Sequence, residues 1–106
     1  MSILHLNDTD FADAVKSGVT LVDFWADWCG PCRMFGPVFE AAALIHTNIK
    51  FAKFEVGPAN KEIPAKYGIR SIPSVLAFRD GELISAKTGL MQPADMEQWI
   101  AEIGVK

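Results

Sequence analysis

The strongest restriction on the fold comes from an almost unbroken apolar run, Val19-Thr20-Leu21-Val22-Asp23-Phe24-Trp25. Its β-branched and aromatic residues are typical of a central strand that is buried on both faces of a sheet. Such a strand needs a helical layer on each side. The run therefore predicts an α/β architecture, in which Asp23 is the single carboxylate of the inner strand.

Strand and helix patterns alternate on both sides of this run. Further strands are predicted at 3–6, 49–56, 74–79 and 82–88, and helices are predicted between 8 and 18, over 29–46, from 60 to 67 and over 93–103. Asp80-Gly81 separates the last two strands and is typical of a tight hairpin, so those strands are predicted to be antiparallel. The expected fold is a mixed five-stranded sheet flanked by four helices, in a single domain over residues 1–106.

Two details of the helices can also be predicted. Asp8-Thr9-Asp10 provides capping side chains for the helix that follows it, and Asn60 is expected to cap the short helix after it. Periodicity predicts which residues of helix 29–46 face the core, and Phe35 is expected to join them. The predicted stripe is Met34, Val38, Ala41, Ala42 and Ile45.

Composition excludes some classes of partner. The chain is 50% hydrophobic and 22% charged, as in proteins that fold around a core. Its net charge of -3 and the lack of a basic cluster argue against nucleic acid and anionic membranes as partners. Residues 1–8 have no Lys or Arg before their short apolar run, unlike a secretory signal peptide. We therefore expect a cytoplasmic protein.

Trp28-Cys29-Gly30-Pro31-Cys32 is the segment that carries chemistry. Cys29 follows the buried strand and begins a helix, where unpaired N–H groups and the helix dipole favour a thiolate. The thiolate is the species that attacks a disulfide, so Cys29 is the predicted nucleophile. Cys32 lies on the same helix face and is predicted to resolve the mixed disulfide. The uncharged Gly30-Pro31 linker favours a reductant over an oxidant.

Two other interpretations of the cysteine pair compete with this one. A structural disulfide across so short a loop stabilises by only about 2 kcal/mol in the chain-entropy estimate. Zinc requires about four ligands, and His5 and His46 form no second paired motif. The sequence therefore predicts a redox-active dithiol and no metal site.

The chain resembles the thioredoxin family over nearly its whole length. The residues that carry the resemblance are Asp23-Phe24-Trp25-Ala26, Trp28-Cys29-Gly30-Pro31-Cys32, Pro37, Ala52-Lys53, Lys66-Tyr67-Gly68-Ile69-Arg70, Ile72-Pro73, Phe78-Arg79-Asp80-Gly81 and Gly89. The resemblance implies a thioredoxin fold and a monomer that reduces disulfides in client proteins. It also implies that a thioredoxin reductase, which consumes NADPH, returns the chain to its dithiol form. The chain itself has no Gly-rich dinucleotide loop and is expected to bind no cofactor.

The resemblance assigns Asp23 and Lys53 to the catalytic site. From the residues alone, Asp23 either lies in the core or faces water at a sheet edge. In the family the matching Asp lies beneath the cysteines and helps to deprotonate the second one, here Cys32. Burial is expected to raise the pKa of Asp23. Lys53 matches the family lysine that approaches this Asp, and its charge is expected to oppose that rise, although an ordinary surface lysine is the alternative.

The resemblance also implies a surface for the client. An X-Pro bond is cis in only about 5% of cases, so the residues alone predict a trans bond before Pro73, whereas the family has a cis-proline there. The backbone before that proline is then free to pair with an extended client segment. The residues implied in client binding are Trp28, Gly30, Pro31, Ile72, Pro73, Gly89 and Leu90. Leu90 stands where the family often has a small residue, which enlarges one wall of this surface.

Two other classes of function compete with disulfide reduction. A binding module would use the same apolar surface while its thiols remained incidental. A disulfide oxidase or isomerase would use the same cysteines in the opposite direction, but the Gly-Pro linker and the amino-terminal sequence both disfavour it. The leading prediction is therefore a cytoplasmic protein-disulfide reductase.

Overall fold

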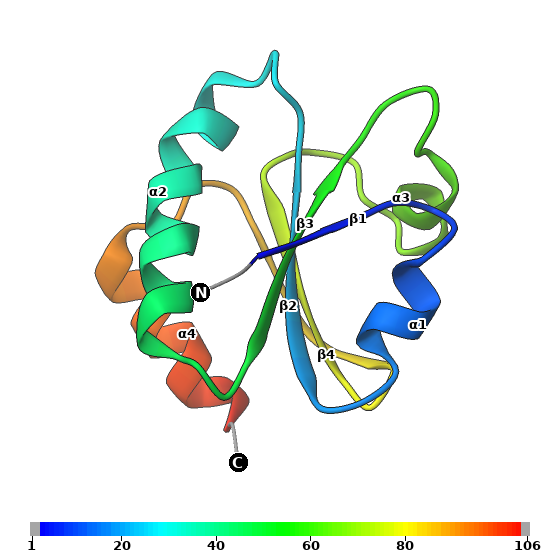
Figure 1. Cartoon of the computed structure of the whole chain (residues 1–106). Helices are drawn as coiled ribbons and strands as arrows, with labels where there is room; N and C mark the ends of the chain where they lie inside the picture. Colours follow the sequence, from blue (N-terminus) through cyan, green and yellow to red (C-terminus); the bar gives the residue numbers. More distant parts are fainter. Residues whose placement is uncertain (1–2, 105–106) are drawn as a thin grey trace.

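A five-stranded mixed sheet with the strand order β1-β3-β2-β4-β5 forms the centre of the computed structural model (Figure 1). Residues 3–104 are described, so residues 1–2 and 105–106 of the expected domain lie outside the described part. Strands β1, β3 and β2 are parallel, and β4 and β5 complete the sheet in antiparallel pairings. The elements are β1 (Leu4–Leu6), α1 (Phe11–Val15), β2 (Val19–Trp25), α2 (Gly30–Ile45), β3 (Lys50–Glu55), α3 (Glu62–Lys66), β4 (Ser74–Arg79), β5 (Glu82–Thr88) and α4 (Pro93–Ile103).

Helices cover both faces of the sheet, with α2 and α4 on one side and α1 and α3 on the other (Figure 1). Alternate residues of β2 point to the two layers, because side chains along a strand alternate in direction. Val19 and Leu21 pack in the core beneath α2 and α4, whereas Val22 and Phe24 pack against α1. Asp23 has the same parity as Leu21 and therefore faces the α2 side.

The predicted α/β class, the five strands and the four helices are confirmed. Strand β2 is buried along almost its full length, as its apolar run predicts. The β4–β5 hairpin has the predicted bounds, and Asp80 and Gly81 both have positive φ, at 51° and 87°. A two-residue turn of this type needs positive φ at both positions, which explains the Asp-Gly pair.

The prediction for the helix caps was wrong. The Asp8 carboxylate does not cap α1. Instead it accepts hydrogen bonds from the backbone N–H groups of Glu62 and Ile63, at 3.0 and 2.9 Å, at the start of α3. Asn60 does not cap α3 either, since its Oδ1 accepts from the N–H of Asp8 at 3.3 Å. The loop before α1 thus caps α3 across more than 50 residues of sequence, whereas α1 has no side-chain cap.

The predicted core stripe of α2 was also wrong. Met34 is 65% exposed, and Ala41 and Ile45 are exposed as well. Helix α2 is apolar around most of its circumference, so its periodicity cannot identify the face that meets the sheet. Phe35 and Ala42 are buried as expected, and Val38 is partly buried against the same core. The buried residues of the helix are Cys32, Phe35, Gly36, Phe39, Ala42 and Ala43.

Within residues 3–104, none of the helices combines the length and hydropathy that crossing a membrane requires.

Candidate functional site

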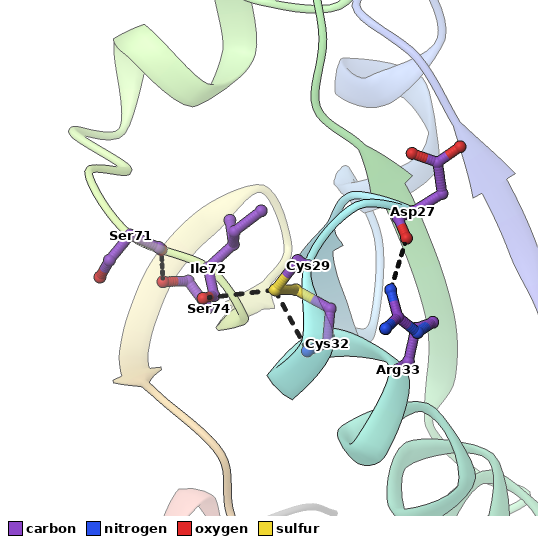
Figure 2. Close-up of a disulfide and its surroundings, with 7 residues drawn as sticks. All are labelled: Asp27, Cys29, Cys32, Arg33, Ser71, Ile72 and Ser74. Carbon is purple, nitrogen blue, oxygen red and sulfur yellow. Dashed lines mark hydrogen bonds between the residues drawn. A yellow bond between two sulfur atoms is a disulfide. The ribbon is translucent and has the colours of Figure 1, made fainter.

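Cys29 and Cys32 form a disulfide at the amino-terminal end of α2 (Figure 2). Cys29 is the N-cap residue, and the backbone N–H of Cys32 donates to its Sγ at 3.2 Å. Gly30 and Pro31 occupy the first two helical positions, where proline is favoured because its missing N–H needs no partner. This arrangement directs the N–H of Cys32, in the first turn of the helix, toward the sulfur of Cys29.

The loop before β4 lies against the disulfide. Sγ of Cys29 is 3.8 Å from the carbonyl oxygen of Ile72 (Figure 2). The Ile72–Pro73 peptide bond is cis, as the family resemblance implies. The Ser74 hydroxyl donates to the carbonyl oxygen of Ser71 at 2.7 Å, and the N–H of Gly89 donates to that of Pro73 at 2.8 Å. These bonds hold the proline loop between the cysteines and β5.

The residues expected to bind a client differ in how accessible they are. Trp28 is 74% exposed and Leu90 is 38% exposed, so both present apolar area to solvent. Pro31 is exposed too. Pro73 is buried, and the partly buried members of the set are Gly30, Ile72 and Gly89. A client can therefore contact the side chains of Trp28 and Leu90 more readily than that of Pro73.

A shallow pocket of about 160 Å³ lies next to Trp28, the residue before Cys29. Trp28 and Ile72 contribute to its wall, together with residues that were not predicted for the site. Those additional residues are Val56, Pro64, Ile69, Arg70 and Ser71. Their contribution depends on how α3 and the following loop pack, which local sequence patterns do not reveal.

Asp23 is buried in β2, with 1% of its surface exposed. Its Oδ1 has no hydrogen-bond partner among the described residues. Burial raises the pKa of Asp23 to about 7, the positive charge of Lys53 lowers it, and the negative charge of Glu40 raises it. Of the two alternatives at the sequence level, burial is therefore the observed one, and the carboxyl exchanges its proton near neutral pH.

Lys53 lies opposite Asp23 in the parallel pairing of β2 and β3. Its Nζ forms an ion pair of 2.8 Å with Oε2 of Glu40 on α2, and no ion pair to Asp23 is present in the described part of the chain. Nζ also lies 5.8 Å from the centre of the Trp25 ring. Lys53 is thus neither an ordinary surface lysine nor a direct partner of Asp23.

Glu40 is the charged residue of the site that sequence reasoning missed. One signal was available, because Glu40 is the single acidic residue within the apolar sequence of α2. Its partner was not predictable, since the contact joins α2 to β3. The hydroxyl bond of Ser74 to the carbonyl oxygen of Ser71 also carries no local signal in the sequence.

The zinc alternative receives no support from the histidines. Nε2 of His46 lies 2.7 Å from Oε1 of Glu97 on α4, far along the chain from the cysteines. No group of three or more potential metal-binding side chains is found within residues 3–104. The redox group that the site does contain is the disulfide itself.

Comparisons with known proteins find one matching family model and several similar curated proteins. The family model described as "Thioredoxin" matches residues 2–102. The thioredoxin of Rickettsia bellii (strain RML369-C) is 43% identical over 99 residues, which cover 91% of this chain and 93% of that protein. The thioredoxin of Haemophilus influenzae (strain ATCC 51907 / DSM 11121 / KW20 / Rd) is 37% identical over 101 residues, covering 92% and 94%. The thioredoxin of Staphylococcus aureus (strain Mu50 / ATCC 700699) is 43% identical over 96 residues, covering 90% of each chain.

Proposed function

The chain belongs to the thioredoxin family, and from that premise we propose that it is a protein-disulfide reductase that works through Cys29 and Cys32. The observation that carries the proposal is the Cys29–Cys32 disulfide at the start of α2, with the Ile72–Pro73 loop beside it. A helix N-terminus favours the thiolate that disulfide exchange requires.

The first step begins from the reduced protein. The Cys29 thiolate attacks one sulfur of the client disulfide, and the S–S bond of the client breaks. A mixed disulfide between Cys29 and the client forms, while the other client sulfur leaves as a thiolate and takes a proton from solvent. The N–H of Cys32 and the helix N-terminus stabilise the attacking sulfur.

The second step releases the client. Asp23 accepts the proton of the Cys32 thiol, and the Cys32 thiolate attacks Sγ of Cys29. The Cys29–Cys32 disulfide forms, and the second client sulfur leaves as a thiolate that is protonated in turn. Two electrons have then passed from this protein to the client. A carboxyl whose pKa is about 7 suits this role because it accepts and returns a proton near neutral pH.

The client is held by an apolar surface beside the sulfurs. Trp28 and Leu90 offer exposed apolar side chains, and the pocket next to Trp28 has room for a small client side chain. The carbonyl of Ile72 faces Cys29 and is positioned to accept a backbone hydrogen bond from an extended client segment. We propose that Gly30, Pro31, Pro73 and Gly89 complete this surface by allowing the client backbone to approach closely.

A reductant must be returned to its dithiol form after each cycle. We propose that a flavin-dependent thioredoxin reductase performs this step at the expense of NADPH, and that the protein acts as a monomer in the cytoplasm. The reducing conditions of that compartment match a donor of electrons to disulfides.

Insulin reduction tests the proposal. The protein is expected to accelerate precipitation of insulin chains by dithiothreitol, and to do so with NADPH when thioredoxin reductase replaces dithiothreitol. Normal turnover by Cys29→Ser would eliminate the mechanism. Full complementation of a deletion strain by a variant with both cysteines changed to serine would instead support a binding module. A measured redox potential in the oxidising range would favour the oxidase or isomerase alternative.

A further inference from the structure

The ion pair between Lys53 and Glu40 has no role in the mechanism described above. Lys53 extends from β3 across to α2, where a Cβ placed on Gly36 would lie only 3.7 Å from its Nζ. Glu40 follows Gly36 by four residues, one helical turn later, and its carboxylate binds the ammonium at 2.8 Å. The lysine therefore lies along the inner edge of α2 and ends at Glu40.

Asp23 lies beside Lys53 but does not form an ion pair with it. Asp23 and Lys53 are paired in register, so their side chains point to the same side of the sheet. A lysine in this position would normally form an ion pair with a buried carboxylate, because the uncompensated charge is costly. Yet Oδ1 of Asp23 has no partner among the described residues, whereas Lys53 is bound to Glu40.

Few other charged groups can influence this pair. On β1, His5 is in register with Lys53 but is exposed at the sheet edge. On β4, Val75 lies opposite Asp23 and carries no charge. On α2, Arg33 is exposed and donates to the carbonyl oxygen of Asp27, so the remaining titratable groups besides Glu40 are Cys32 and the N-cap residue Cys29 once they are reduced. Within the described part of the chain, Glu40 is therefore the one acidic group that binds the Lys53 ammonium in place of Asp23.

We propose that Glu40 is a positioning residue for proton transfer at Cys32, because its carboxylate binds the Lys53 ammonium on the α2 side and so leaves the Asp23 carboxyl without an ion-pair partner. The inference rests on the proposed function, since it assigns Glu40 to the second step of client reduction. Without Glu40 the ammonium turns toward Asp23 and stabilises its carboxylate. A carboxylate stabilised in this way is a weaker base toward the Cys32 thiol.

The effects of the Lys53 and Glu40 charges on the pKa of Asp23 support this inference. Lys53 lowers the pKa of Asp23 and Glu40 raises it. Glu40→Gln removes the raising charge and frees the lowering one, so both changes act in the same sense. The Glu40 side chain is 52% exposed, and its replacement by Gln leaves no cavity in the core. The variant is therefore expected to fold.

The direct experiment follows the Asp23 carboxyl carbon by ¹³C NMR as a function of pH in the disulfide form of the protein. Glu40→Gln is expected to lower the titration midpoint of Asp23 by about 1 pH unit. The reason is that the Lys53 ammonium, no longer paired with Glu40, stabilises the Asp23 carboxylate. Glu40→Asp keeps the charge and should retain part of the raised midpoint. Glu82→Gln is the matched control, because Glu82 is exposed at the start of β5 and its loss should leave the midpoint unchanged.

A double-mutant comparison separates positioning from direct repulsion. In a Lys53→Met background, Glu40→Gln is expected to lower the midpoint by much less than it does in the native background. An equal shift in both backgrounds would show that Glu40 acts without Lys53, and an unchanged midpoint in Glu40→Gln would show no influence. Either result overturns the inference.

A kinetic measurement links the titration to the reaction. The rate at which the protein resolves a mixed disulfide with a peptide is measured as a function of pH. The midpoint of this pH profile should be lower in Glu40→Gln, by the same amount as the midpoint of the carboxyl titration. The NMR experiment needs no client and no turnover. Failure of the parent protein to reduce insulin would therefore reject the proposed function while leaving the test of Glu40 intact.

Discussion

The backbone N–H of Cys32 donates a hydrogen bond of 3.2 Å to Sγ of Cys29. The same amide would otherwise be one of the unpaired donors in the first turn of α2. The nucleophile is thus also the cap of its own helix, and a negative charge on its sulfur strengthens that bond. The second cysteine contributes its backbone to the first step before its thiol takes part in the second step.

This division of roles predicts opposite behaviour for the two serine variants. Cys29→Ser is expected to reduce insulin no faster than dithiothreitol alone, because it lacks the attacking sulfur. Cys32→Ser is expected to attack the client once and then to remain attached, because no thiol resolves the mixed disulfide. Non-reducing electrophoresis and mass spectrometry will detect the trapped adduct. An adduct on Cys32 of the Cys29→Ser variant, together with no adduct on Cys29 of the Cys32→Ser variant, would reverse the assignment.

Burial of Asp23 predicts that stability decreases as pH rises. The folded-state pKa of about 7 exceeds the ordinary value of 3.8, so the folded protein binds more protons than the unfolded chain between these values. The free energy of unfolding then falls across this window and becomes constant above about pH 7. The loss is on the order of 4 kcal/mol, at about 1.4 kcal/mol for each pH unit.

Asp23→Asn tests this expectation in the disulfide form, because Asn resembles the protonated acid at every pH. Urea denaturation at pH 4 should give similar stabilities for the two proteins, whereas at pH 8 the variant should be more stable by about 4 kcal/mol. Parallel pH profiles would mean that Asp23 titrates normally. The same variant should slow insulin turnover at neutral pH, since Asn cannot accept the proton of Cys32.

The exposed indole of Trp28 predicts a binding effect without a stability effect. Trp28→Ala should raise KM for insulin roughly tenfold, equivalent to about 1.4 kcal/mol of client binding. Its free energy of unfolding should change by less than about 0.5 kcal/mol, because the side chain contributes little to the core.

Leu44→Ala is the matched control for Trp28→Ala. Leu44 is 62% exposed on α2 but lies near the opposite end of the helix from the cysteines. The KM of Leu44→Ala for insulin should equal that of the parent protein. Equal increases in both variants would show that general surface hydrophobicity, and not the site next to the disulfide, binds insulin.

The contact of Asp8 with α3 predicts a local change in dynamics. Asp8→Ala removes the acceptor for the N–H groups of Glu62 and Ile63, which should then exchange faster with deuterium. Hydrogen exchange measured by NMR will report both amides. Asp13→Ala removes an exposed carboxylate of α1 that forms an ion pair with Lys16, so it should leave these two amides unaffected.

Local patterns in the sequence determined most of the architecture. The apolar run of β2, the Asp80-Gly81 turn and Pro93 at the start of α4 each depend on interactions within a few residues, and the structure has all three where the patterns predict them. The same holds for the position of Cys29 at the start of α2. Backbone preferences and periodicity are properties of neighbouring residues, so they can be read without knowledge of the fold.

Only the tertiary structure decided which groups meet across different elements. The face of α2 that is buried depends on its rotation against the sheet, since its own sequence is apolar on most sides. The Asp8 carboxylate had suitable donors at α1 and at α3, and the packing of the chain brought it to α3. Lys53 could pair with Asp23 across the strands or with Glu40 on α2, and in the folded chain it pairs with Glu40. These choices depend on distances between segments far apart in the chain, which local sequence does not encode.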